Sequence, residues 1–346
     1  MSRRERISGI ASSFKNKNIE INFNNLKQAY LETYGKIETN ESSLNTSIYN
    51  FLKELKGDNM EDNNYVKESD IEFSVPEINE SFYLSEKDER ILDYVYQRAL
   101  CGENNNIMLV GPHGCGKSES VQQYAAKRNL KFFETNCSLY REPRDFFGFK
   151  GASQGNTYMR KADLIKAFQT DDTVILLDEI NRAVPSVTNS LYSLLDDRRT
   201  VYFDEIGFVK VAKGVTVFAT KNVGLQYTGT MPSDRSLNDR FKITLEVSYL
   251  TDDKEIDLLV KRTGIESRDA SLLVKFANTV RAKATEIGSS LRETISTRTL
   301  LGCAEVFSVV GKEAIDYTIL PLYSKEGGSN SERTQVKMIQ QLVFGD

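Results

Sequence analysis

The stretch Gly111–Ser118 reads GPHGCGKS, and its spacing matches G-x-x-x-x-G-K-[ST], the pattern of a loop that wraps nucleotide phosphates. Glycines let the backbone turn sharply and approach the phosphates, so that successive N–H groups and a helix N-terminus point at negative charge. Lys117 would place a positive charge near the β and γ phosphates, and the Ser118 hydroxyl would bind Mg²⁺. The residues predicted to contact the phosphates are Gly111, Pro112, His113, Gly114, Cys115, Gly116, Lys117, Ser118 and Glu119.

The segments on either side of this loop agree with that interpretation, which requires a strand before the loop and a helix after it. Residues 106–110 (NIMLV) are typical of a buried strand, and residues 118–129 form an amphipathic helical pattern. The sequence therefore predicts a nucleotide-binding strand–loop–helix unit.

The loop also holds the only histidine of the chain and one of its four cysteines, so a metal or thiol site has to be considered. A zinc site needs three or four ligands, usually with cysteines paired at short spacing. The cysteines here, at positions 101, 115, 137 and 303, are far apart and no second histidine exists. A metal or nucleophile role is therefore disfavoured, although a steric or redox influence of Cys115 on nucleotide binding stays open.

Composition limits the class of protein. The 346 residues are 40% hydrophobic and 27% charged, which is ordinary for a soluble globular chain with room for two or three compact units. A net charge of −4 argues against a protein whose main role is to coat nucleic acid. We expect no membrane span, no secretory signal and, from the scattered cysteines, a reducing cytoplasmic location.

Four regions differ in pattern. Residues 1–57 are basic, with nine Lys and Arg against six Asp and Glu, and contain predicted helices around Asn25–Tyr34 and Ser42–Leu55. Residues 58–80 hold eight acidic residues against Lys67 alone and are predicted to be a flexible acidic linker. Residues 81–250 form the predicted α/β core, and residues 251–346 a helical lid.

Within the core, apolar β-prone segments alternate with helical ones, which indicates a parallel sheet covered on both faces. The predicted strands are 106–110, 131–135, 173–178, 215–220 and 243–247. The predicted helices, one before the first strand and the rest in the lid, are 85–100, 252–263, 268–287, 296–310 and 331–344.

A second group of site residues follows the third of these strands, where TVILLDEINRA places Asp178 and Glu179 at its end. Asp178, beside the phosphate loop, can hold Mg²⁺, and Glu179 can act as general base on the attacking water. Asn222 ends a further apolar strand and would position that water or detect the γ phosphate; a simple turn-forming asparagine is the alternative.

Three arginines are candidates for further contacts with phosphate. Arg235 and Arg240, in SDRSLNDRFK, follow a long connection and would reach the phosphates of a neighbouring copy more easily than their own. A guanidinium supplied in this way is worth roughly 10³–10⁵ in rate. Arg298 lies in the first turn of a helix capped by Ser296, an end that disfavours cations, so an anionic partner such as the nucleotide is indicated.

Two excursions from the core exceed what a sheet connection requires. Residues 200–203 and 208–211 are β-prone runs around Gly207, which predicts a hairpin. Residues 146–168 carry three glycines before a helix. We expect substrate contacts in these two insertions.

These residues together resemble the AAA+ ATPase family. LLDEINRA is similar to the signature of the MoxR-type, dynein-related clade. FATKNVGLQYTGT, LNDRFKI, VSYL, STRTLL and ERTQVKMIQQLVFG are similar to the small ATPase subunit of aerobic cobaltochelatase and its relatives, including copies in phage genomes. The resemblance covers roughly residues 75–346; residues 1–57 differ from that subunit, and cobalt insertion resides in a separate large subunit.

The resemblance implies a P-loop AAA+ fold with sheet order 5-1-4-3-2, and a hexameric ring with ATP and Mg²⁺ between subunits. It implies Gly111–Ser118 as Walker A, and Asp178 with Glu179 as Walker B. Asn222 would be sensor 1 and Arg298 sensor 2, with Arg240 as the arginine finger and Arg235 as a second trans arginine. It further implies a partner with a von Willebrand factor A-type domain and, for a phage-encoded copy, the host cytoplasm.

The leading hypothesis is a Mg²⁺- and ATP-dependent motor that remodels a partner protein. A second hypothesis is a DNA-linked motor, motivated by the basic N-terminal segment and its interleaved Phe14, Phe23 and Tyr30. A third is a regulatory ATPase that residues 1–57 dock onto a structural assembly.

Overall fold

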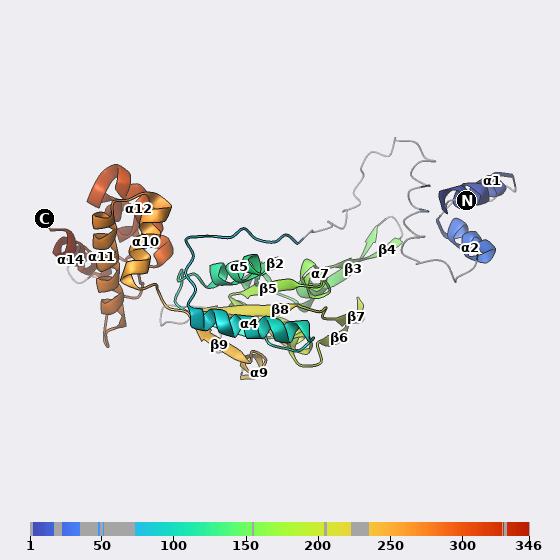
Figure 1. Ribbon diagram of the computed structural model, residues 1–346, viewed down its shortest axis with the longest axis horizontal. Coiled ribbons are helices and arrows are strands. Elements are labelled where there is room, and N and C mark those ends of the chain that lie inside the picture. The colour runs from blue at the N-terminus through green and yellow to red at the C-terminus, as the bar shows by residue number, and fades with distance from the viewer. Residues whose placement is uncertain are drawn as a thin grey trace. The chain divides into compact units, whose positions relative to one another are not determined.

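The computed structural model describes residues 3–16, 23–34, 48, 51, 73–153, 156–203, 206–222, 235–326, 328 and 331–345. The chain divides into two compact units, residues 1–70 and 71–346 (Figure 1). The boundary between them falls inside the segment that was expected to be a linker.

The larger unit is built on a sheet of five strands that are all paired in parallel. The α/β fold expected from the sequence is therefore confirmed. From one edge to the other the strands are β9 (Ile243–Glu246), β1 (Ile107–Gly111), β8 (Thr216–Asn222), β5 (Thr173–Asp178) and β2 (Lys131–Asn136). Counted along these five strands alone, the order is 5-1-4-3-2.

Helices cover both faces of the sheet because successive apolar residues of each buried strand point to opposite sides. Ile107, Val174 and Phe218 pack on one face against α4 and α5, whereas Ile175 and Val217 pack on the other face against α6, α7 and α8. The helices are α4 (Glu86–Leu100), α5 (Lys117–Lys127), α6 (Pro143–Phe147), α7 (Asp163–Phe168) and α8 (Pro185–Leu195).

Both insertions contain antiparallel hairpins. The hairpin of β6 (Thr200–Phe203) and β7 (Gly207–Lys210) was expected, but the pairing of β3 (Gly148–Ser153) with β4 (Asn156–Lys161) was not. The glycines at 148, 151 and 155 had masked the strand pattern of the second pair. The short elements that complete the core are η1 (Cys137–Leu139), η2 (Ile180–Arg182) and α9 (Arg235–Asn238).

The C-terminal region is a helical lid with a hydrophobic core of its own. Its helices are orange and red in Figure 1, and no strand occurs among its described residues, 251–326, 328 and 331–345. Ser296 and Ser331 cap two of them by accepting hydrogen bonds from backbone N–H groups three residues on. The elements are α10 (Asp252–Thr263), α11 (Ser267–Thr285), α12 (Thr297–Val310), η3 (Gly311–Glu313), α13 (Ala314–Thr318), η4 (Leu320–Leu322) and α14 (Glu332–Phe344).

The N-terminal unit contains α1 (Arg3–Asn16) and α2 (Phe23–Tyr34). Helix α1 was not expected, because its many charged residues give only a weak apolar stripe. Of the helix expected at 42–55, only residues 48 and 51 lie among the described residues, and both are helical. Tyr30 is buried in the core of this unit and Phe14 packs against that core.

Residues 73–80 differ from the expected linker, since they lie against the α/β core. Ser74 O accepts a hydrogen bond from Phe132 N at 3.0 Å, and Phe73 packs edge-on against Phe133. Asn79 is bound to helix α5 through Gln123, whose side chain accepts from its backbone N–H at 2.8 Å. These apolar and amide contacts outweigh the acidic composition on which the linker prediction was based.

No helix among the described residues combines the length and the apolar character that a membrane span requires.

Candidate nucleotide site

The phosphate loop connects the end of β1 to the start of α5, and its glycines allow close contacts that a side chain would block. A Cβ atom on Gly111 would lie 2.0 Å from Val247 O. Gly114 has a φ of +65°, and a Cβ there would lie 2.6 Å from the Cβ of Ser296 in the lid. These two glycines therefore let the backbone of the phosphate cradle pack closely against the segment after β9 and against the lid.

Lys117 lies inside this cradle. Its side chain is buried, and Nζ donates to Gly111 O at 3.1 Å and to Pro112 O at 2.6 Å. Burial lowers the pKa of Lys117, while the nearby Asp178 and Glu179 oppose that shift. The two carboxylates favour the protonated form of Lys117, and the negative charge of bound phosphates would favour it further.

Asp178 lies across from the first turn of α5, where the Ser118 hydroxyl donates to its Oδ1 at 3.3 Å. The hydroxyl of Thr220, on the adjacent strand β8, donates to the same carboxylate oxygen. A hydroxyl and a carboxylate at this separation are oxygen ligands of the kind that Mg²⁺ takes beside substrate phosphates. The residues present therefore fit a magnesium ion.

Glu179 follows Asp178 with a left-handed backbone, φ 52°, which turns its side chain away from the direction of the strand. Asn222 Nδ2 donates to Glu179 Oε1 at 3.0 Å. Arg182 pairs with Oε2 at 3.2 Å, and Asn136 Nδ2 lies 3.5 Å from the same oxygen. The carboxylate is thus held between donors from three elements. It lies at the carboxyl ends of the strands, where the phosphate loop also lies.

Thr220 was missed by the sequence reasoning, although it connects both carboxylate residues. Besides donating to Asp178, its hydroxyl accepts a hydrogen bond from Glu179 N at 2.8 Å. It lies in the apolar run of β8 and is almost fully buried, so the pattern gave it only a structural role. Asn136 and Arg182 were also missed. Asn136 ends β2 in the same way that Asn222 ends β8, so its position at a strand end could have indicated a site residue.

Thr220→Val is expected to lower the free energy of unfolding by about 1–3 kcal/mol, because it leaves the Glu179 N–H without its acceptor. It is also expected to slow ATP hydrolysis, because the orientation of both carboxylates depends on that hydroxyl. Denaturant unfolding and steady-state rates measure the two effects. Thr220→Ser keeps the hydroxyl and should restore both; a serine variant as impaired as the valine variant would contradict the assignment.

His113 and Cys115 are the two residues of the loop with an imidazole or thiol side chain, which can ligate a metal ion. Among the described residues no group of three or more His, Cys, Asp or Glu side chains is placed to hold a metal ion. Burial raises the pKa of the Cys115 thiol, which disfavours the nucleophilic thiolate. Burial, and then Arg298 and Lys117, lower the pKa of His113.

Arg298 comes from the lid to the phosphate loop. A Cβ atom on Gly114 would lie 3.6 Å from the Cβ of Arg298, and its charge acts on His113. The side chain is exposed, and Arg298 is the second residue of α12, two positions after the Ser296 cap. The lid therefore places the positively charged side chain of Arg298 beside the phosphate loop.

Arg240 lies at the amino ends of the strands, opposite the end that carries the phosphate loop. Its carbonyl accepts a hydrogen bond from Asn106 Nδ2 at 3.0 Å. Strand β1 separates Asn106 from Gly111 by about 17 Å, since each strand residue adds about 3.3 Å. The guanidinium stacks over Tyr192 at 4.0 Å and donates to Ser236 O at 2.6 Å. Arg235 is exposed at the start of α9. Neither arginine joins the phosphate loop of its own chain.

The Glu119 side chain forms two hydrogen bonds within its own chain. Its carboxylate accepts from Asn79 Nδ2 at 2.8 Å and from Gln123 Nε2 at 3.3 Å. The side chain of Glu119 thereby anchors the segment around Asn79 to α5.

Residues 106–241 match the family described as "AAA domain (dynein-related subfamily)", and residues 255–326 match "CbbQ/NirQ/NorQ C-terminal". The "Putative chaperone BssE" of Thauera aromatica is 36% identical over 244 residues, which are 70% of this chain and 83% of that protein. The chain belongs to the dynein-related subfamily of AAA ATPases. The expected ATPase family is thereby confirmed, within the MoxR-like clade, and ATP with Mg²⁺ are its substrate and cofactor.

Two further proteins are similar to this AAA ATPase. An uncharacterized protein of Staphylococcus epidermidis is 32% identical over 235 residues, 64% of this chain and 86% of that protein. The Thermotoga maritima RuvB Holliday junction branch migration motor has a TM-score of 0.46 and 18% identity, and covers 79% of this chain and 73% of its own.

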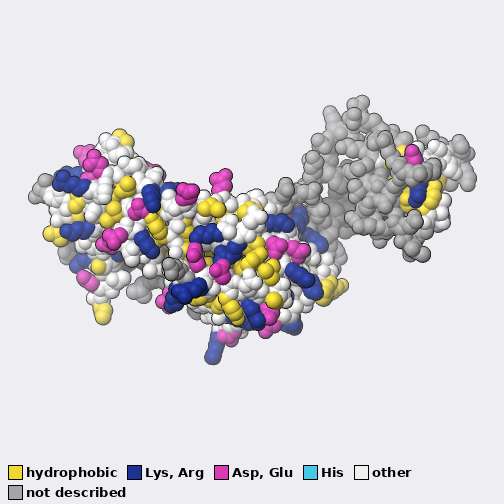
Figure 2. All heavy atoms as spheres, viewed as in Figure 1, with side chains coloured by type: hydrophobic (Ala, Val, Ile, Leu, Met, Phe, Trp, Pro, Cys, Tyr) yellow, Lys and Arg dark blue, Asp and Glu magenta, His cyan; other side chains and the backbone are white. Residues whose placement is uncertain are grey.

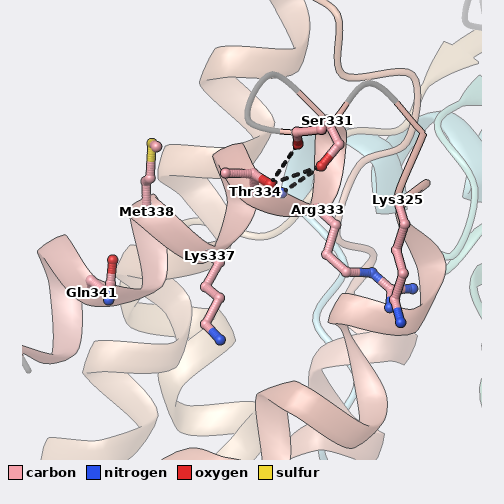
Figure 3. A pocket seen from close by; sticks show the side chains of 8 residues that line it. Lys325, Ser331, Arg333, Thr334, Lys337, Met338 and Gln341 are labelled. Atoms are coloured by element: carbon pink, nitrogen blue, oxygen red, sulfur yellow. Dashed lines mark hydrogen bonds between the residues drawn. The ribbon is translucent and has the colours of Figure 1, made fainter.

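The AAA ATPase also has a pocket of about 340 Å³ on its lid. Lys325, Arg333 and Lys337 contribute side chains to it, and Ser331 and Thr334, whose hydroxyls are hydrogen-bonded to each other, also line it (Figure 3). All of its lining residues belong to α14 and the preceding loop. The lid therefore presents a basic hollow that shares no residue with the nucleotide site.

Proposed function

We propose that this AAA ATPase is a ring-forming motor that hydrolyses ATP between subunits, in a hexamer, and uses the resulting motions to remodel a partner protein. Ser118 and Asp178 hold Mg²⁺, and Glu179 is the general base, oriented by Asn222. Arg298 reads the nucleotide from the lid. Arg240 completes the site of the neighbouring subunit, assisted by Arg235.

The position of Arg240 carries this proposal. Its backbone is bound beside Asn106, at the start of strand β1, whereas the phosphate loop follows the end of that strand. The intervening length of strand exceeds the reach of an arginine side chain. A guanidinium supplied by a second copy can stabilise the transferred phosphoryl group, so we infer that the site is complete only in an assembly.

The dependence of the rate on protein concentration tests the assembly. We expect the ATPase rate per subunit to rise with concentration as rings form, and to fall on dilution into the nanomolar range. Size-exclusion chromatography with light scattering, with and without ATP, gives the oligomeric state at each concentration. A constant rate per subunit in a protein that stays monomeric would show that one chain holds the whole site.

The β6–β7 hairpin supports a protein partner. Tyr202 and Phe208 are directly paired across its two strands, and their side chains are 66% and 65% exposed. Two exposed aromatic rings side by side are costly in water and are frequent in protein interfaces. The partner we propose carries a von Willebrand factor A-type domain, in keeping with the MoxR-like clade; a relationship to the cobaltochelatase subunit is a finer proposal within it.

A DNA-linked motor is less well supported. Tyr30, one of the aromatic residues that motivated it, is buried between the N-terminal helices, and Phe14 packs against the same core. On the face of residues 71–346 shown in Figure 2, basic side chains are interspersed with acidic ones. Backbone-tracking nucleic-acid sites usually present a continuous basic groove.

A further inference from the structure

Tyr249 connects the lid to the backbone of the phosphate loop. It lies between strand β9 and helix α10, in the segment where the chain passes from the core to the lid. Its hydroxyl donates to His113 O at 3.2 Å and lies 3.1 Å from the Thr294 hydroxyl. Because a phenol has a single proton, the donation to His113 leaves Thr294 as the donor in the second bond.

The ring of Tyr249 is held by the lid. The Arg281 guanidinium lies 3.9 Å from the ring centroid, and Arg281 pairs with Glu255 through two bonds, of 2.7 and 2.9 Å. The side chains of Arg281 and Glu255 are only 9% and 0% exposed. Arg281 also donates to Ile295 O at 2.7 Å, so this pair fixes the ring relative to α10, α11 and the start of α12.

The bond to His113 O determines which way one peptide of the loop faces. A trans peptide is planar, and its C=O and N–H point in opposite directions. With His113 O turned toward Tyr249, the N–H of Gly114 is turned away from it. Gly114 has a positive φ and no side chain, so nothing in the residue itself prevents this peptide from rotating.

We propose that Tyr249 is a positioning residue for nucleotide binding, which holds the 113–114 peptide with its N–H available to the phosphates and makes that orientation depend on the lid. Burial raises the pKa of Tyr249, so the hydroxyl remains a donor through the neutral range. The lid thereby acts on the phosphates in two ways, by the charge of Arg298 and by the shape of the loop.

The test is Tyr249→Phe in the full-length protein, which keeps the ring and its contact with Arg281. Loss of the hydrogen bond to His113 O is expected to weaken ATP and ADP binding by about 5-fold and to raise KM for ATP accordingly. We expect kcat at saturating ATP and the melting temperature to stay near those of the parent. Unchanged nucleotide affinity, or a fall in kcat and melting temperature without a change in KM, would overturn the proposal.

Two control variants separate the loop contact from a general effect on the lid. Tyr323→Phe removes a buried lid hydroxyl that has no hydrogen-bond partner among the described residues. Thr294→Val removes the other contact of the Tyr249 hydroxyl and leaves the bond to His113 O in place. Both should bind ATP as the parent does; a loss in Thr294→Val equal to that in Tyr249→Phe would place the effect in the lid and refute the role of the peptide.

Discussion

Glu179→Gln is expected to bind ATP with the affinity of the parent while hydrolysing it at least ~100-fold more slowly, because an amide cannot accept the proton of the attacking water. The glutamine carbonyl still accepts from Asn222, whose amide lies 3.0 Å from Glu179 Oε1, so the local structure persists. Equilibrium binding of ATP and single-turnover hydrolysis measure the two quantities separately.

Glu134→Gln is the matched control for this experiment. Glu134 is a carboxylate on the neighbouring strand β2, and burial raises its pKa, so it is a rival candidate for proton transfer. It is expected to leave the hydrolysis rate unchanged. Should the rate fall in Glu134→Gln and persist in Glu179→Gln, the assignment of the general base would be wrong.

Arg240→Ala is expected to lower kcat by roughly 10³–10⁵, because it removes the guanidinium that we propose stabilises the transferred phosphoryl group from the adjoining subunit. ATP affinity should be retained, since Lys117 and the phosphate loop are intact. Arg240 also stacks on Tyr192, so thermal unfolding has to show that the variant is folded. Arg235→Ala, which removes an exposed side chain of α9, is expected to have a smaller effect.

Mixing two inactive variants tests whether the site is shared. Lys117→Ala removes the phosphate ligand and keeps Arg240, whereas Arg240→Ala does the opposite. In mixed rings, an Arg240→Ala subunit that binds ATP can receive the arginine of a Lys117→Ala neighbour, so part of the rate should return. If mixed assemblies form, as shown by co-purification through a tag on one variant, and remain inactive, then Arg240 does not act between subunits.

The local elements of the core and lid could largely be predicted from the sequence. Strand β5 and helix α10 begin and end where their patterns indicated, and Ser85, Ser296 and Ser331 cap their helices. These features depend on short-range spacing. Helix α1 and the β3–β4 hairpin were missed because charge in the one and glycines in the other obscure the periodicity that packing nevertheless enforces.

Some residues of the candidate site could likewise be predicted from the sequence, and others could not. Gly111–Ser118, Asp178 and Glu179 could be proposed from the sequence because a phosphate loop and a carboxylate pair require those residue types at fixed spacing. Thr220 and Tyr249 could not, since a threonine inside an apolar strand and a tyrosine in a connection carry no local signal. Their roles come from hydrogen bonds to residues more than 40 positions away.

By itself, the sequence determined that this chain binds a nucleoside triphosphate in an α/β core, because a phosphate cradle requires particular residue types at consecutive positions. Only the tertiary structure decided which side chains orient the carboxylates, that Glu119 turns to Asn79, and that Arg240 lies at the opposite end of the strands from the phosphate loop. Those outcomes depend on strand order and register, which bring distant segments together or keep them apart.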